Sequence, residues 1–370
     1  MHIAIAPDSF KECLTSRNVA SAIRKGILDI YPDAKCSTYL VSDGGEGFLE
    51  VIEHYVPGIL RISSQTVDPL GRLILADYLY DDSAKTAYVE LAQASGLHLL
   101  NSSERNPLKT STFGTGLQIG QAIEQGANII YVGLGGSATN DAGMGIAQAL
   151  GYLFLDKEGC VLNARGENLE NVRTMHRPKE EIQAKIIVIN DVQNPLFGSN
   201  GAAYVYAEQK GANRDDIILL DAGLKHFSNV NIMDLKGIVA HDKGSGSAGG
   251  TAYGLKTFFN AHYIPGTDFV FKLAGLYGLL NRGTFDLVIT GEGKVDKQTY
   301  QGKLIQGIIR AAKPSQTPVA AVCGKLELTT EEIKILGLYK AVAIHQPNQS
   351  LDYSFRHAEK LIRENVKKLL

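Results

Sequence analysis

The chain has 370 residues, of which 44% are hydrophobic and 21% are charged, and its formal net charge at pH 7 is −2. This composition is typical of a globular protein and excludes an intrinsically disordered one. The length exceeds that of one ordinary core and fits two domains. Because the charge is nearly balanced and no basic stripe is present, we expect no nucleic-acid partner.

Local features disfavour three further classes of protein. No apolar run is long enough to cross a bilayer, so we expect no membrane partner. The first residues, MHIAIAP, predict a short strand rather than a signal peptide, and we therefore expect a cytoplasmic protein. The four cysteines lie far apart and form no CxxC pair, which argues against a zinc site and against a disulfide framework.

Short strands and helices alternate at both ends of the chain. At the N-terminal end the pattern predicts strands at 2–6 and 36–41 and helices at 18–30 and 48–55. From residue 285 the alternation returns, with strands at 286–290, 318–322 and 340–344 and helices at 299–312, 330–336 and 354–370. Such alternation is typical of a parallel sheet that is covered by helices.

The middle of the chain has a different pattern. Segments 60–67, 72–80 and 86–91 are separated by turn signals and predict an antiparallel meander. Farther along, the sequence predicts helices at 114–125, after residue 215 and at 249–262, and strands at 129–132, 185–189 and 202–206. The middle therefore reads as mixed α/β.

We predict an α/β fold with a Rossmann-like parallel sheet domain formed by both chain ends, residues 1–60 and 285–370. A mixed α/β domain, residues 61–284, is inserted between them. Three serial domains are the alternative, although the first would then have only two strands. Ligands of parallel α/β sheets bind beyond the carboxyl ends of the strands, and we expect the active site in the cleft between the two domains.

The glycine-rich stretch 129–151, IIYVGLGGSATNDAGMGIAQALG, joins a predicted buried strand to a helix that ends before Gly151. Gly133, Gly135 and Gly136 permit a sharp turn and a close approach of the backbone to a ligand. Four helix N-cap types follow them, namely Ser137, Thr139, Asn140 and Asp141. Free N–H groups at a helix start favour an anion, and phosphate is the first candidate. A loop that only serves packing is the alternative.

Six polar loops combine glycines with carboxylates or small polar residues. They are 8–11 (DSFK), 43–47 (DGGEG), 135–141 (GGSATND), 191–195 (DVQNP), 244–250 (GSGSAGG) and 291–296 (GEGKVD). Backbone N–H groups can hold phosphate oxygens while carboxylates hold a divalent cation, so the loops indicate a polyanionic ligand with a bridging metal. Neither a Walker A motif nor the protein-kinase signature set is present.

Many collinear motifs of this chain resemble those of the bacterial-type (type 1) glycerate kinase family. They are APDSFK, SDGGEG, DPLG, VELAQASGL, TSTFGTG, GLGGSATNDAGMG, DVQNPLFGSNGA, EQKGA, SAGG and LVITGEGKVDKQTYQGK. The resemblance implies transfer of the γ-phosphoryl group of ATP to a hydroxyl of D-glycerate, with Mg²⁺, in organic acid catabolism. It favours 2-phosphoglycerate over 3-phosphoglycerate as the product, and it also implies two α/β domains, one inserted in the other.

Phosphoryl transfer needs a group that orients or accepts the hydroxyl proton and groups that neutralise charge on the γ-phosphoryl. We predict Asp191 as general base or metal ligand, Lys11 as a point charge for phosphate or carboxylate, and Asp43 as a further catalytic carboxylate. An Asx turn that caps its own loop is the alternative for Asp191.

Binding of substrate and phosphate is predicted for a second set of residues, which comprises Asp8, Ser9, Gly44, Gly45, Gly135, Gly136, Ser137, Thr139, Asn194 and Glu292. The metal is assigned to Asp191 and Asp296. The residues do not decide which domain binds ATP, although we favour phosphate for the glycine-rich loop.

Two other functions fit the pattern. One is a kinase for another small hydroxy acid on the same scaffold. The other is a non-catalytic two-domain binding protein, against which the missing signal peptide and the number of loop carboxylates argue. The partners that we expect are the small molecules glycerate and ATP, and both a monomer and a homodimer stay open.

Overall fold

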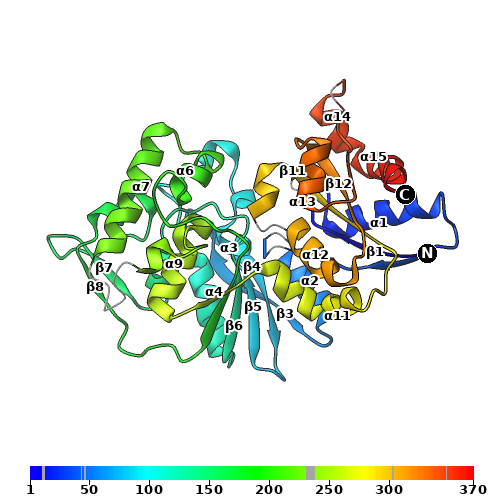
Figure 1. The fold of residues 1–370 in the computed structure, drawn as a ribbon. Coiled ribbons are helices and arrows are strands. Elements are labelled where there is room, and N and C mark those ends of the chain that lie inside the picture. Colours follow the sequence, from blue (N-terminus) through cyan, green and yellow to red (C-terminus); the bar gives the residue numbers. More distant parts are fainter. Residues whose placement is uncertain (11–12, 43, 46, 231–237, 302–303, 347) are drawn as a thin grey trace. The chain divides into compact units, whose positions relative to one another are not determined.

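The computed structural model describes residues 1–10, 13–42, 44–45, 47–230, 238–301, 304–346 and 348–370 (Figure 1). The chain forms two compact units. Unit 1 comprises Met1–Asp43 and Gly266–Leu370, and unit 2 comprises Gly44–Pro265. Both chain ends therefore belong to one unit, and a continuous middle segment forms the other. The units change over at 43/44 and 265/266, whereas the boundaries expected from the sequence lie at 60/61 and 284/285.

Unit 1 is built on a five-stranded sheet in the order β13-β12-β11-β1-β2, in which every neighbouring pair is parallel. The strands are β1 (His2–Pro7), β2 (Lys35–Thr38), β11 (Leu287–Val295), β12 (Val319–Leu326) and β13 (Lys340–Ala343). The N-terminal strand β1 lies between β2 and β11, so both chain ends share one sheet (Figure 1). The predicted parallel sheet of the two chain ends is confirmed.

Helices cover the sheet of unit 1. On one side, α1 (Ser16–Leu28) packs against α15 (Ala358–Asn365), and their apolar side chains meet Ile3 and Ile5 of β1 in a buried cluster. Burial of these side chains stabilises the unit, at about 25 cal/mol for each Å² of apolar surface. The remaining helices of the unit are α10 (Gly266–Leu273), α11 (Leu276–Asn281), α12 (Leu304–Ala312), α13 (Thr330–Leu336) and α14 (Leu351–Arg356).

Unit 2 contains a six-stranded mixed sheet in the order β10-β9-β6-β5-β4-β3. Its strands are β3 (Leu60–Val67), β4 (Leu73–Asp81), β5 (Thr86–Glu90), β6 (Ile129–Gly133), β9 (Lys185–Ile189) and β10 (His262–Ile264). β3, β4 and β5 form the antiparallel meander that the sequence predicts, while β5, β6, β9 and β10 run parallel. The carboxyl ends of the parallel strands thus lie at one edge, which is where the glycine-rich loops emerge.

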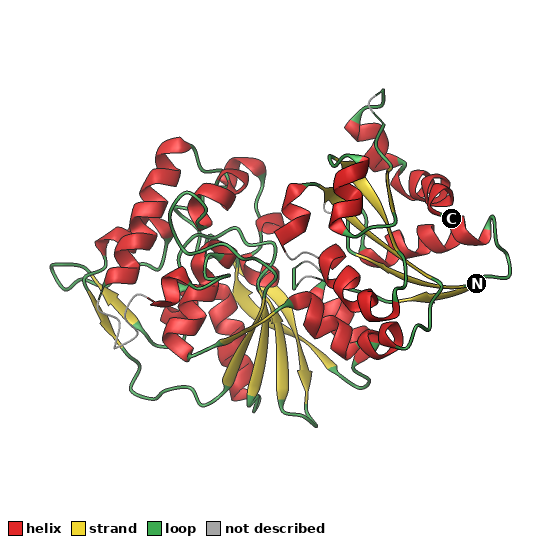
Figure 2. Ribbon diagram, viewed as in Figure 1, coloured by secondary structure: helices red, strands yellow, loops and turns green. Residues whose placement is uncertain are grey.

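Helices also surround the sheet of unit 2 (Figure 2). They are α2 (Phe48–Tyr55), α3 (Ala92–Ser95), α4 (Phe113–Glu124), α5 (Met144–Ala149), α6 (Ala202–Tyr206), α7 (Arg214–Asn229), α8 (Ile238–His241) and α9 (Ser247–Phe259). A separate ribbon pairs β7 (Leu153–Leu155) with β8 (Thr174–His176). Throughout the described ranges, every helix is too short or too polar to cross a bilayer.

The strand that the sequence predicts at 202–206 is a helix, α6. Tyr204 and Val205 have high β-propensity, but both are exposed, whereas Ala202 and Ala203 are buried. α6 packs against α7 and α9, and the small side chains at its start allow that close approach. Tertiary packing therefore overrides the local preference of this segment.

Candidate active site

The glycine-rich loop after β6 packs directly against the loop that precedes α2. The N–H of Gly135 donates to the carbonyl oxygen of Gly44 at 3.1 Å. A Cβ on Gly135 would lie 2.1 Å from the Cα of Gly45, and a Cβ on Gly133 would lie 2.6 Å from the carbonyl oxygen of Gly44. Glycine is therefore required here because two stretches of backbone touch. Gly136 is required for a different reason, since its φ of +72° lies in the left-handed region.

Asp141 organises the start of α5. Its carboxylate accepts hydrogen bonds from the N–H and hydroxyl groups of Thr112, both at 2.8 Å, and from the N–H groups of Gly143 and Gly145 at 3.1 and 3.2 Å. The residue is fully buried, and this burial raises the pKa of its carboxyl group. A carboxylate of the chain thus uses the helix-start donors that could otherwise hold a phosphate.

Lys210 is the strongest candidate residue that our sequence analysis missed. It is only 3% exposed, and its ammonium group donates to the Ser137 hydroxyl at 2.8 Å and to the Thr139 carbonyl at 2.7 Å. Burial lowers the pKa of Lys210 to about 7, against a smaller raising effect of Asp141. Its only signal in the sequence is the motif EQKGA, which carries the resemblance but suggests no role.

Close to the Lys210 ammonium, the side chains of Thr139 and Asn140 are buried and have polar atoms without a hydrogen bond among the described residues. Both the oxygen and the nitrogen of the Asn140 side-chain amide are unpaired, and so is the hydroxyl of Thr139. Each such group costs about 1–3 kcal/mol, so native folds retain few of them. This stretch of the loop therefore carries polar groups that its own fold does not use.

The loops after β9 and before α9 complete the polar end of unit 2. The amide of Asn190 donates to the carbonyl of Gly244 at 3.1 Å and accepts from the N–H of Val192 at 2.7 Å. Asn190 thus makes an Asx turn at the start of this loop, while the Asx turn that we considered for Asp191 stays a prediction. Asn194, a predicted binding residue, donates to Asn200 and accepts from Tyr206, so both ends of its amide hold the loop together.

Strained backbone marks the contact between the glycine-rich loop and the non-helical first residues of α9. Ala142 and Ala248 have φ values of +54° and +51°, which are uncommon for residues with a Cβ. The N–H of Ala142 donates to the carbonyl of Gly249 at 3.0 Å, and a Cβ on Gly249 would lie 2.1 Å from the carbonyl oxygen of Thr139. Such conformations cost about 1–3 kcal/mol each and cluster at functional sites.

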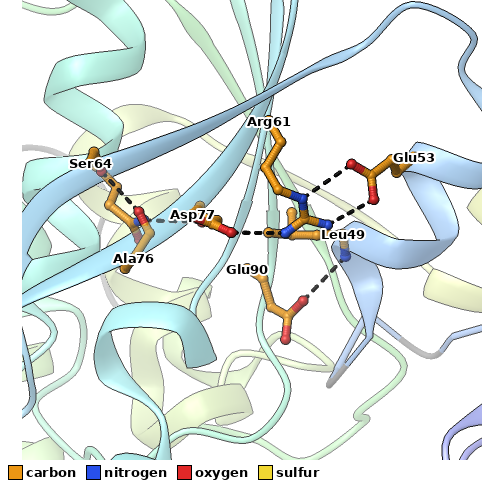
Figure 3. A network of polar contacts seen from close by, with 8 residues as sticks. Leu49, Glu53, Arg61, Ser64, Ala76, Asp77 and Glu90 are labelled. Atoms are coloured by element: carbon orange, nitrogen blue, oxygen red, sulfur yellow. Dashed lines mark hydrogen bonds and ion pairs between the residues drawn. The ribbon is translucent and has the colours of Figure 1, made fainter.

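Figure 3 shows how α2 is fixed beside the sheet of unit 2. The carboxylate of Glu90, at the end of β5, is buried and accepts from the N–H of Leu49 at the start of α2, at 3.2 Å. Arg61 binds Glu53 through two nitrogens, at 3.1 and 2.9 Å, and reaches Asp77 at 3.0 Å. The Glu90 contact holds the helix start that follows Gly44 and Gly45.

In unit 1 the predicted residues Asp8, Ser9 and Glu292 line one cavity of about 370 Å³. The cavity lies at the carboxyl ends of β1, β11 and β12, the edge where parallel sheets bind ligands. Glu292 is buried and accepts from the N–H of Ile305 at 3.4 Å. Burial, with a smaller effect of Glu292, raises the pKa of Cys323 to about 12, so this thiol stays protonated.

The predicted metal ligands have different surroundings. The carboxylate of Asp296 pairs with the ammonium of Lys294 at 3.0 Å, while Asp191 lies partly buried just after β9 in unit 2. Within the described ranges, no group of three or more His, Cys, Asp or Glu side chains is arranged to hold a metal ion. Lys11 and Asp43, which we predicted as catalytic, lie outside the described residues.

The structure therefore gathers the predicted residues in two places. Unit 2 brings together the glycine-rich residues Gly44, Gly45, Gly135, Gly136, Ser137 and Thr139, with the loop of Asp191 and Asn194 adjoining. Unit 1 brings together Asp8, Ser9 and Glu292. The interdomain position that we expect for the active site stays a prediction.

The chain is similar to known proteins over almost its whole length. Residues 3–370 match the model of the glycerate kinase family. A glycerate kinase of Halalkalibacterium halodurans is 39% identical, with 99% of this chain and 97% of the relative covered. A glycerate 2-kinase of Escherichia coli is 38% identical, with 97% and 94% covered.

A solved structure is also similar. A crystal structure from Salmonella typhimurium LT2, described as that of a glycerate kinase 2, superimposes with a TM-score of 0.77 at 35% identity. The similarity covers 100% of this chain and 97% of that one, so it includes both units. The chain thus belongs to the glycerate kinase family and is a kinase that acts on an alcohol group.

Proposed function

We propose that this protein phosphorylates D-glycerate with ATP and releases 2-phosphoglycerate, as a step of organic acid catabolism. Membership of the glycerate kinase family supports ATP as the phosphoryl donor and glycerate as the acceptor. The relative from Escherichia coli is named a glycerate 2-kinase, which supports the 2-hydroxyl as the group that reacts.

The observation that carries the proposal is the buried ammonium of Lys210 beneath the glycine-rich loop. It fixes the Ser137 hydroxyl and the Thr139 carbonyl, next to unpaired polar atoms of Thr139 and Asn140. A small acid with a carboxylate and two hydroxyls presents many polar atoms in a small volume. Donors that are fixed before binding stabilise such an anion without further ordering cost.

Proton transfer is assigned to Asp191. A carboxylate near the reacting hydroxyl orients it and accepts its proton as the oxygen attacks the γ-phosphorus. Lys11 and Asp43 keep their proposed catalytic roles, as a point charge for the phosphoryl oxygens and as a second carboxylate. Asp191 and Asn194 follow the same strand, β9, in a loop held by Asn190.

Mg²⁺ belongs to the proposal as well, because it neutralises charge on the β- and γ-phosphate oxygens when it is bound. Protein sites usually hold it through one or two carboxylates, and phosphate oxygens and water complete its shell. Asp8 and Glu292 line the same cavity and fit this pattern. We also retain Asp191 and Asp296 as proposed ligands; at Asp296 the metal would displace the ammonium of Lys294.

A substrate panel tests the proposal. ADP release is measured with ATP and D-glycerate, L-glycerate, glycolate or tartronate, with Mg²⁺ and after its removal by EDTA. We expect release with D-glycerate and its loss in EDTA. Release with another acid but none with D-glycerate would replace the proposed substrate, and activity unaffected by EDTA would remove the metal.

A further inference from the structure

The cavity of unit 1 is too large and too apolar for a three-carbon acid alone. Its volume of about 370 Å³ lies in the range of pockets for drug-sized ligands, roughly 300–1,000 Å³. Phe10, Leu304, Ile344, Leu351 and Phe355 supply apolar walls. Glycerate has no apolar surface beyond its short carbon chain, so these walls would desolvate its oxygens without pairing them. A flat aromatic ring matches such walls much better.

Two of these apolar side chains are unusually exposed. Leu351 and Phe355, which lie one helical turn apart on α14, are 58% and 51% exposed. Both line the cavity, together with Ser354 of the same helix. The hydroxyl of Ser354 lies 2.9 Å from Nδ1 of His345, which is also part of the wall. A ligand ring in the cavity would cover apolar surface that the chain itself leaves in water.

Positive charge lies on the same cavity wall. Lys294 and Lys325 occupy paired positions on β11 and β12, and both line the cavity. Their ammonium groups contact Glu327 at 2.9 and 2.7 Å. Exposed ion pairs of this kind contribute only about 0–1 kcal/mol, so a polyphosphate can replace the carboxylate.

We propose that this cavity binds the nucleoside end of the phosphoryl donor, with the purine base against the apolar walls and its phosphates toward Lys294 and Lys325. The inference rests on the proposed function, because that function names ATP as the donor. It names the ATP subsite, which the sequence left undecided, and it differs from our preference there for phosphate at the glycine-rich loop. Asp8 and Glu292, on the same wall, are then placed to share a cation with the nucleotide's phosphates.

The test compares a double variant in the cavity wall with a control variant at an exposed site elsewhere in unit 1. The double variant Leu351→Ala/Phe355→Ala removes apolar wall, and Ile335→Ala removes a side chain on α13 that is 76% exposed and does not line the cavity. All three side chains are exposed, so folding is retained, which thermal melting checks. Binding is measured by fluorescence with N-methylanthraniloyl-ADP, and displacement by ADP and by inorganic tripolyphosphate is recorded.

We expect the Kd for the fluorescent ADP to rise about tenfold or more in the double variant and to stay unchanged in Ile335→Ala. The affinity for tripolyphosphate should stay the same in both, since it has no base. In steady state, the KM for ATP rises while the KM for D-glycerate changes less than twofold.

Other outcomes overturn the inference. If only the KM for D-glycerate rises in the double variant, the cavity binds the acid. If the KM values for ATP and for D-glycerate both stay unchanged, the cavity is not a substrate site. Equal losses for ADP and tripolyphosphate would show that the apolar walls do not hold a base. If the wild-type protein phosphorylates no acid, the proposed function fails, but loss of ADP binding in the double variant still supports the nucleotide subsite.

Discussion

At the scale of single residues, Asp191 carries the proposed proton transfer. Asp191→Asn keeps the shape of the side chain and removes its charge and basicity. We expect kcat to fall by about 10²–10⁴-fold, the usual contribution of a positioned general base, with a small change in KM. Steady-state kinetics with saturating ATP measure this. A fall of less than tenfold would leave Asp191 as a residue of the loop alone.

From the lowered pKa of Lys210 we predict that the stability of the fold depends on pH. In the folded chain its pKa is lowered to about 7, whereas in the unfolded chain it returns to about 10.5. Between these values the unfolded state binds more protons, so the free energy of unfolding rises with pH over this window. Below about pH 7 the fold carries the full cost of a buried charge. The raised pKa of Asp141 acts in the opposite direction at lower pH, as that carboxyl ionises.

The measurement is urea unfolding of the wild-type protein and of Lys210→Met at several pH values from 6 to 10. The wild type should gain stability relative to the variant as the pH rises, because only the wild type has the lysine to deprotonate. Lys85→Met, at a lysine that is 48% exposed, serves as control and should follow the wild type. A constant difference between wild type and Lys210→Met across this range would contradict the account.

At the scale of elements, the two polar contacts of α2 should differ in strength. Glu90 is buried and caps the start of the helix, whereas Arg61 bridges Glu53 and Asp77 near the surface (Figure 3). We expect Glu90→Ala to cost about 1–3 kcal/mol, since it leaves a buried N–H unpaired, and Arg61→Ala less than about 1 kcal/mol. Urea unfolding compares them, and equal costs would refute the distinction.

The contact between the two glycine loops gives a second prediction at this scale. Gly135→Ala places a methyl group on the backbone of Gly45, so the loops must separate, and we expect at least a tenfold loss of kcat/KM. Gly120→Ala is the matched control. Gly120 lies within α4, and a Cβ there would meet only the side chain of Leu150, at 3.7 Å. It should leave activity unchanged and stabilise the fold by about 0.4–1 kcal/mol. Normal activity of Gly135→Ala would show that this packing does not shape the site.

At the scale of the whole molecule, periodicity predicted most of the framework. The strands at 60–67, 129–132 and 185–189 occur where the apolar pattern places them, and both chain ends form one parallel sheet. The pattern failed at 202–206, where packing of α6 decides the conformation. The pattern gave no start for the helix after the glycine-rich loop, and in the fold this helix, α5, begins at Met144 after Gly143.

The candidate site was less predictable than the fold. Glycines and carboxylates at strand ends indicated which loops would matter, since those residue types have a local signature. The motif EQKGA, which contains Lys210, suggests no role by itself. Lys210 lies 73 residues from Ser137, and only the folded chain buries its ammonium against the loop. The sequence also gave no sign that the Asn194 amide binds Asn200 and Tyr206, and its predicted role in ligand binding stays a prediction.

The central claim is that ATP phosphorylates the 2-hydroxyl of D-glycerate on this protein. The most direct test is proton-coupled ³¹P NMR of the product formed from ATP and D-glycerate by the wild-type chain. A phosphate on the 2-oxygen is attached to a carbon with one hydrogen, so we predict a doublet. A triplet, from the two hydrogens at carbon 3, would contradict the assigned position, and consumption of ATP without any phosphoglycerate resonance would contradict the activity itself.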